Sequence, residues 1–93
     1  MQVTHVTLDV DVVKHVELPK KAGAIIVKNL TSGDLLVSIC KEDFTNNYVK
    51  IPSMMGEELF KNELYSASKP YFFKDVYLKS SDGGEVEIRS LTR

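Results

Sequence analysis

Cysteine, tryptophan and long apolar runs are scarce in this 93-residue sequence, which has one Cys, no Trp and three Pro. Because Cys40 has no second cysteine to pair with, these residues form no internal disulfide bond and no multi-thiolate metal site. Small secreted domains usually depend on disulfides, so we expect folding in the cytosol. No stretch approaches the roughly 18 apolar residues of a membrane helix. Residues 1–5 also lack the basic start and apolar run of a secretory signal.

Charge of one sign is equally lacking: 12 basic and 13 acidic side chains leave a net charge of −1. A protein that binds nucleic acid needs a concentrated positive field, so we expect no nucleic-acid partner. The lack of a long apolar stretch leads us to expect no membrane partner either. The chain is long enough for one domain, residues 1–93. A domain of this length has a radius of gyration of about 12 Å and a diameter of about 32 Å. This leaves little room for a deep catalytic cleft.

The most prominent pattern present is an alternation of period two from Val6 to Leu18. Six of the seven even positions are apolar, whereas one of the six odd positions is, which predicts a strand with one face on a core. Residues 3–18 would extend about 53 Å as one strand, more than the expected diameter. Either a bend near Val13-Lys14 divides them into two strands, or residues 1–8 form an extended arm. The arm alternative favours an oligomer.

Further strands are predicted where short aliphatic runs are separated by polar connections. Residues 24–29 with 35–40, and 72–79 with 85–89, are interpreted as two hairpins because the connections between them are short and contain glycine. A shorter strand is expected at 48–51. Residues 53–62 fit two alternatives: a short helix capped by Ser53, or a strand through 57–60.

The number and spacing of these segments predict the fold class. Six to eight short strands at intervals near ten residues, without helical crossovers, favour an all-β protein. We therefore expect an antiparallel β-sandwich or a small jelly-roll-like barrel, with the short helix near 53–62 left open as an alternative.

Asp9 and Asp11 are the candidate cation ligands, since two carboxylates two residues apart on a strand lie about 7 Å from each other. His5 and His15 share their face, but each is about 13 Å from the nearer aspartate, too far to bind the same ion. A solvated face that discourages aggregation explains these four residues more simply. We therefore predict no metal site.

Three other motifs give no catalytic set. Ser66 and Lys69 match the S-x-x-K string of a lysine-activated serine, but the companion motifs are missing and the segment reads as a loop. Cys40 ends an aliphatic strand and is interpreted as a small core residue. Asn29-Leu30-Thr31 fits the glycosylation sequon, although Asn29 more simply begins a turn. We predict no catalytic residues, no cofactor and no enzymatic activity.

Aromatic side chains suggest binding instead, because five of the eight aromatic residues fall within 65–77. Neighbouring aromatics on a strand cannot all face one core, so some rings are expected at an interface or on a sugar-stacking surface; a second small core is the structural alternative. Together with the proposed arm, this gives a set of candidate interface residues: Val3, Val6, Tyr71, Phe72 and Tyr77.

Two glycine-containing segments carry a resemblance to a known class of proteins. Asn29-Leu30-Thr31 and Gly33-Asp34 lie between strands in 22–38, and an Ile51-Pro52 corner and the closing segment 76–89 follow. In this order they resemble small β-sandwich proteins of tailed-phage virions, over about half of the chain. The resemblance implies self-assembly, with other copies and other virion proteins as partners, and a location in the host cytoplasm and then in the virion.

The predicted function is therefore a non-enzymatic structural protein of a phage or prophage virion, in its capsid, neck or tail. The alternative is a carbohydrate- or peptide-binding β-sandwich module that uses Tyr71, Phe72 and Tyr77.

Overall fold

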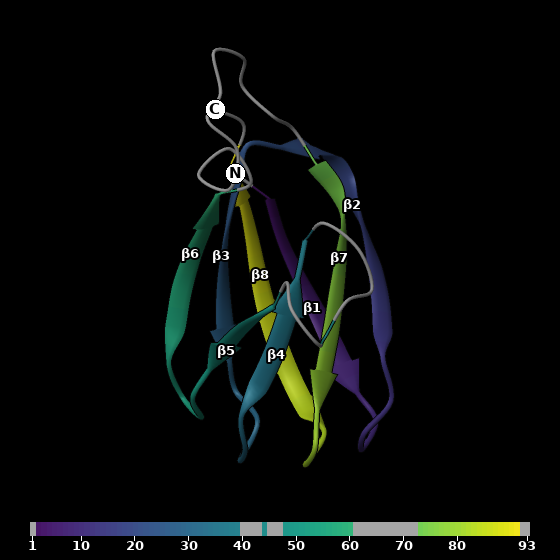
Figure 1. Cartoon of the computed structure of the whole chain (residues 1–93). Coiled ribbons are helices and arrows are strands. Elements are labelled where there is room, and N and C mark those ends of the chain that lie inside the picture. Colours follow the sequence, from purple (N-terminus) through teal and green to yellow (C-terminus); the bar gives the residue numbers. More distant parts are fainter. Residues whose placement is uncertain (1, 40–43, 45–47, 61–72, 92–93) are drawn as a thin grey trace.

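The computed structural model describes residues 2–39, 44, 48–60 and 73–91. Eight strands form two four-stranded antiparallel sheets that face each other across a common core (Figure 1). The strands are β1 (Gln2–Leu8), β2 (Lys14–Ala22), β3 (Ala24–Asn29), β4 (Leu35–Ser38), β5 (Val49–Ile51), β6 (Gly56–Phe60), β7 (Phe73–Ser80) and β8 (Gly84–Leu91).

The order of strands defines the topology. Sheet A has the order β1-β8-β3-β6, and sheet B has the order β2-β7-β4-β5. Among the described strands, each connection except that between β4 and β5 therefore leads from one sheet to the other. Two facing sheets wound in this way make a jelly roll. The prediction of an all-β antiparallel sandwich or jelly-roll-like barrel is confirmed.

The two predicted hairpins are wrong, although their strands are present. β3 belongs to sheet A and β4 to sheet B, so the connection 30–34 crosses between sheets. The same holds for β7 and β8, whose connection has positive φ at Gly83 (69°) and Gly84 (121°). Short glycine-containing connections specify that the chain reverses. They do not specify whether the next strand pairs at about 4.8 Å or crosses to a sheet about 10 Å away.

The long alternating segment is two strands, one in each sheet. β1 pairs with β8 along all seven of its residues, and β2 pairs with β7. The bend occupies residues 9–13, just before the predicted position, and Asp11 takes a positive φ of 55° there. Val10 and Val12 are exposed, so their expected place on the core face is wrong. An arm formed by residues 1–8 and exchanged between copies stays a prediction.

The helix alternative for residues 53–62 is also wrong over the described part, residues 53–60. A turn with a positive φ at Met54 (63°) leads into β6, which pairs with β3. The strand alternative is confirmed. Gly56 and the short length make an isolated helix weak here, whereas pairing with β3 supplies backbone hydrogen bonds to Gly56–Phe60.

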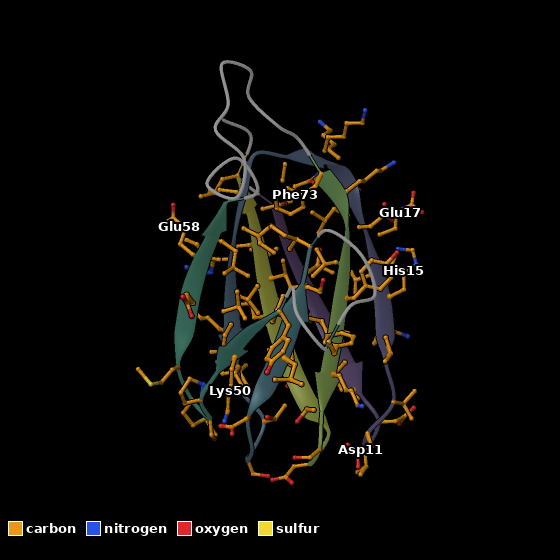
Figure 2. All side chains as sticks on the ribbon, viewed as in Figure 1. Asp11, His15, Glu17, Lys50, Glu58 and Phe73 are labelled. Atoms are coloured by element: carbon orange, nitrogen blue, oxygen red, sulfur yellow. The ribbon has the colours of Figure 1, made fainter. Side chains whose placement is uncertain are left out.

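Branched aliphatic side chains fill most of the space between the sheets, and among the described residues of the core cluster Phe73 supplies the aromatic ring (Figure 2). Such packing leaves the functional groups to the outer faces, edges and ends of the sandwich. The radius of gyration is 12.3 Å, as the chain length predicts. The core cluster comprises Val6, Leu8, Val16, Leu18, Ala22, Ile25, Val27, Leu35, Val37, Ile39, Ile51, Leu59, Phe73, Val76, Leu78, Val86 and Ile88.

Candidate functional site

The four sheet edges differ in how well they are protected against pairing with another strand. β2 carries Pro19, three lysines and a register irregularity, β5 is three residues long, and β6 carries Glu57 and Glu58. Each of these features discourages edge-to-edge pairing. β1 has none of them: its sequence QVTHVTL is seven residues long, without proline, lysine or carboxylate. β1 is therefore the least protected edge among the described strands.

β1 also presents a regular row of side chains to solvent. Val3, His5 and Thr7 are exposed on the outer face of sheet A, while Val6 and Leu8 point into the core. Valine and threonine have high strand propensity, because their branched side chains pack well on a pleated surface. The edge therefore combines backbone groups that face no other described strand with side chains suited to one more strand.

The outer face of sheet B carries a polar cluster where β2 and β7 pair. His15 and Tyr77 are cross-strand partners, and their rings stack with centroids 4.8 Å apart. Nε2 of His15 donates to Oδ1 of Asp75 at 2.8 Å. Figure 2 shows His15 and Glu17 directed away from the core on the same strand. The His15–Asp75 pair is about half exposed, so it contributes little to stability, but it orients the His15 ring that stacks on the half-buried Tyr77 ring.

A hollow of about 330 Å³ lies further along the outer face of sheet B, toward the end where β4 begins and β7 ends. Its volume is at the lower end of the range for small-molecule sites. Lys50 Nζ lies 3.2 Å from Asp34 Oδ2 within it. The hollow is lined by Asp11, Asp34, Leu36, Tyr48, Lys50, Lys79 and Ser81. Figure 2 labels two of these residues, Asp11 and Lys50.

A buried polar corner supports this end of the molecule. The side chain of Asn29 is fully buried and makes four hydrogen bonds. Its Nδ2 donates to the carbonyls of Gly33 (2.8 Å) and Ile51 (2.9 Å). Its Oδ1 accepts from the backbone N (2.9 Å) and hydroxyl (2.6 Å) of Thr31. Asn29 therefore begins a turn, as predicted, and its burial leaves no room for a glycan in the folded chain.

The corner connects the two sheets. Ile51 belongs to β5 in sheet B, whereas Asn29 ends β3 in sheet A. The backbone of Asn29 also donates to the Met55 carbonyl and accepts from the Met54 amide, both at 2.8 Å. Ser53 Oγ donates to the Thr31 carbonyl at 2.6 Å. One asparagine thereby fixes both the 30–34 connection and the segment that precedes β6.

The predicted interface residues are dispersed. Val3 is exposed on β1, Val6 is a core residue that is 7% exposed, and Tyr77 stands on the outer face of sheet B. The residues on β1 and Tyr77 on β7 do not form one surface patch, because the two strands belong to opposite sheets. Tyr71 and Phe72 lie outside the described residues, as do Cys40 and the Ser66–Lys69 segment.

The predicted carboxylate pair is placed on the bend instead of a strand. Asp9 and Asp11 are exposed between β1 and β2, where the Asp9 carbonyl accepts from the Val12 amide at 3.4 Å and the Asp11 amide donates to the Ser80 carbonyl at 2.9 Å. Within the described residues, no three His, Cys, Asp or Glu side chains gather closely enough to bind a metal ion.

Sequence reasoning did not single out Tyr48, Lys50 or Lys79 as neighbours in a hollow. Tyr48 directly precedes β5, Lys50 lies in β5 and Lys79 lies in β7. β4 separates β7 from β5 in the sheet, and many residues separate them in the sequence. Alternation alone could have placed Lys50 and Lys79 on outer faces. It could not have placed them on the same sheet.

Comparison with known proteins extends only to the fold. The sequence matches no protein-family model and no curated protein. The structure is similar to the solution NMR structure of a de novo designed double-stranded β-helix, with a TM-score of 0.57 and 12% sequence identity over 96% of this chain and 97% of that chain. This likeness supports the jelly-roll winding and carries no function. In the described residues, no helix is long and apolar enough to cross a membrane.

Proposed function

We propose that this protein is a non-enzymatic structural protein that self-associates by strand pairing at β1. The observation that carries the proposal is the contrast between the edges: β2, β5 and β6 carry features that hinder pairing, and β1 does not. An exposed edge strand pairs readily with another chain through its backbone groups. The more specific proposal, that the assembly is a phage or prophage virion part, is supported by the resemblance of 22–38, 50–53 and 76–89 to such proteins.

A second copy of the chain is the partner that suits this edge. Antiparallel pairing of two β1 strands about a two-fold axis at His5 places Val3 of each copy beside Thr7 of the other copy. Both residues are exposed on the outer face, so the side-chain row of one sheet continues into the next. Such a contact is self-complementary and joins two four-stranded sheets into one of eight strands.

Light scattering coupled to size-exclusion chromatography over a wide concentration range tests self-association. The full chain is expected to change from monomer to dimer or larger as concentration rises. A V3K/T7K variant is expected to stay monomeric, because lysines on an edge strand oppose pairing. Val12→Lys, at an exposed position in the bend, is the matched control and should associate as the unmodified chain does. Association that is unchanged in V3K/T7K, or its absence in the unmodified chain, contradicts the proposal.

The virion assignment has a separate test. Mass spectrometry of particles purified from an induced host is expected to detect this chain in a fixed ratio to the other virion proteins. If the chain is found only in the soluble fraction and never with particles, the virion assignment is wrong, while self-association at β1 is unaffected.

A second candidate function, binding of a carbohydrate or peptide, is favoured by a different surface. The outer face of sheet B presents the Tyr77 ring stacked on His15 and, further along, the hollow with Tyr48. Aromatic rings at a solvated surface are suited to contact with a ligand, since one face is apolar and the hydroxyl end is polar. The residues that line the hollow indicate which class of ligand it would bind.

A further inference from the structure

The charges that line the hollow on sheet B balance. Two ammonium groups, Lys50 and Lys79, face two carboxylates, Asp11 and Asp34. A site for an anion needs an excess of positive charge, and a site for a metal cation needs an excess of carboxylates. The balanced lining therefore suits a ligand without net charge.

Two of these four groups are engaged with each other, and two are available. Lys50 and Asp34 form an ion pair at 3.2 Å. For Lys79 and Asp11, no side-chain hydrogen bond or ion pair occurs within the described part of the chain. Lys79 is half-buried and Asp11 is exposed at the edge of the hollow. A donor and an acceptor that lack side-chain partners among the described residues favour a ligand that offers both kinds of group.

The remaining lining supplies an apolar surface and one hydroxyl. Leu36 is half-buried on β4 between the cross-strand partners Lys79 and Lys50, and Tyr48 is 42% exposed. Ser81 adds a group that donates and accepts. A flat apolar contact bordered by alternating donors and acceptors matches a pyranose ring, which has C–H groups on its faces and hydroxyls around its edge.

We infer that this hollow binds one uncharged sugar unit, free or at the end of a glycan. The ring lies against Leu36 and Tyr48, and its hydroxyls bond to Lys79, Asp11 and Ser81. The volume of about 330 Å³ is sufficient for a single sugar ring. The inference rests on the second candidate function, carbohydrate binding. It is independent of pairing at β1, which belongs to the other sheet.

The test is a titration of the isotope-labelled full chain with methyl glycosides of glucose, galactose, mannose and N-acetylglucosamine, followed by amide NMR. We expect at least one glycoside to bind with a dissociation constant of about 1 mM, a value usual for a ligand of this size. The largest shifts should occur at Leu36, Lys50, Lys79 and Ser81. Tyr48→Ala and Lys79→Met should each weaken binding about tenfold, with the amide spectrum otherwise preserved.

The comparison variant is Tyr77→Ala, which removes the half-buried ring stacked on His15 from the same sheet, outside the hollow, and should leave glycoside binding unchanged. If binding is lost in Tyr77→Ala and kept in Tyr48→Ala, carbohydrate binding stands and the hollow is the wrong place. If no glycoside binds, the inference fails together with the carbohydrate form of the second candidate function, whereas its peptide form is unaffected. A parallel titration with sodium phosphate distinguishes charge recognition: shifts at Lys79 with phosphate and none with glycosides overturn the inference.

Discussion

Replacement of Asn29 by alanine is predicted to remove a large part of the stability of this protein. Asn29 is fully buried at the junction of the two sheets, and the two polar atoms of its side-chain amide make four hydrogen bonds there. Alanine removes both atoms. The Thr31 hydroxyl can then bond fully to the Gly33 carbonyl, which it already approaches at 2.9 Å. The Thr31 amide and the Ile51 carbonyl lose this partner.

The magnitude follows from these two backbone groups. A buried donor or acceptor left without a partner costs about 1 to 3 kcal/mol, so the loss is about 2 to 6 kcal/mol, centred near 4. A domain of this length has a total free energy of unfolding of about 5 to 14 kcal/mol. The variant should therefore lose roughly a third or more of its free energy of unfolding. Substitution of an ordinary exposed polar residue at the end of a strand changes this free energy by only about 0.5 kcal/mol.

Urea denaturation followed by circular dichroism measures this difference. The transition midpoint of Asn29→Ala should fall at an unchanged m-value, since the surface exposed on unfolding is nearly the same. Ser32→Ala is the control in the same connection. Ser32 is exposed and makes one long contact with Asp82 at 3.2 Å, so its loss should cost less than about 0.5 kcal/mol. A cost below about 1 kcal/mol for Asn29→Ala refutes the assigned role of the corner.

Three further substitution experiments, with the same denaturation assay, test the backbone, the core and the surface. Gly83→Ala should cost about 2 kcal/mol, because φ is 69° and a Cβ would lie 2.9 Å from the Leu8 carbonyl oxygen. Gly56→Ala should cost less than Gly83→Ala, because Gly56 has no positive φ and its Cβ would lie 3.2 Å from the Lys28 side chain and 3.3 Å from the Val27 carbonyl oxygen; an equal loss would contradict this reasoning. Leu8→Ala truncates a buried side chain and should cost about 2 to 5 kcal/mol. Val12→Ala, in the exposed bend, should change the free energy of unfolding by less than about 0.5 kcal/mol. Equal losses would contradict the placement of Val12 in an exposed bend. His15→Ala should cost less than about 1 kcal/mol, since its ion pair with Asp75 is half exposed, and a larger loss would mean that the Tyr77 stack is structural.

The positions of the strands could be predicted from the sequence because alternation and turn residues are local. β3 has the predicted bounds, and β5 and β8 differ from the predictions by a few residues at most. Val6, Leu8, Val16 and Leu18 were placed on a core face by period two alone, and all four are buried. The size estimate also holds, and it correctly required the segment 3–18 to bend or to leave the globule.

Strand partners could not be predicted in the same way, because pairing depends on residues far apart in the sequence. β8 lies between β1 and β3, and β7 lies between β2 and β4. The connections 30–34 and 81–83 have the composition of hairpin turns, yet they cross between sheets. At the first connection the Leu30 amide still donates to the Glu85 carbonyl of sheet A at 3.1 Å, whereas the side-chain amide of Asn29 donates to the Ile51 carbonyl of sheet B. The contact with Ile51, 22 residues away in the sequence, holds the connection against the other sheet.

The candidate sites show the same division. The composition of β1, free of proline, lysine and carboxylate, is a property of the sequence itself, but only the sheet order makes β1 an edge. Lys50, Lys79 and Tyr48 carry no motif, and they become neighbours only because β4, β5 and β7 are adjacent in sheet B. Local alternation and turn chemistry thus determined the strands and their buried faces. Tertiary pairing, which depends on contacts between distant segments, decided the edges and the hollow.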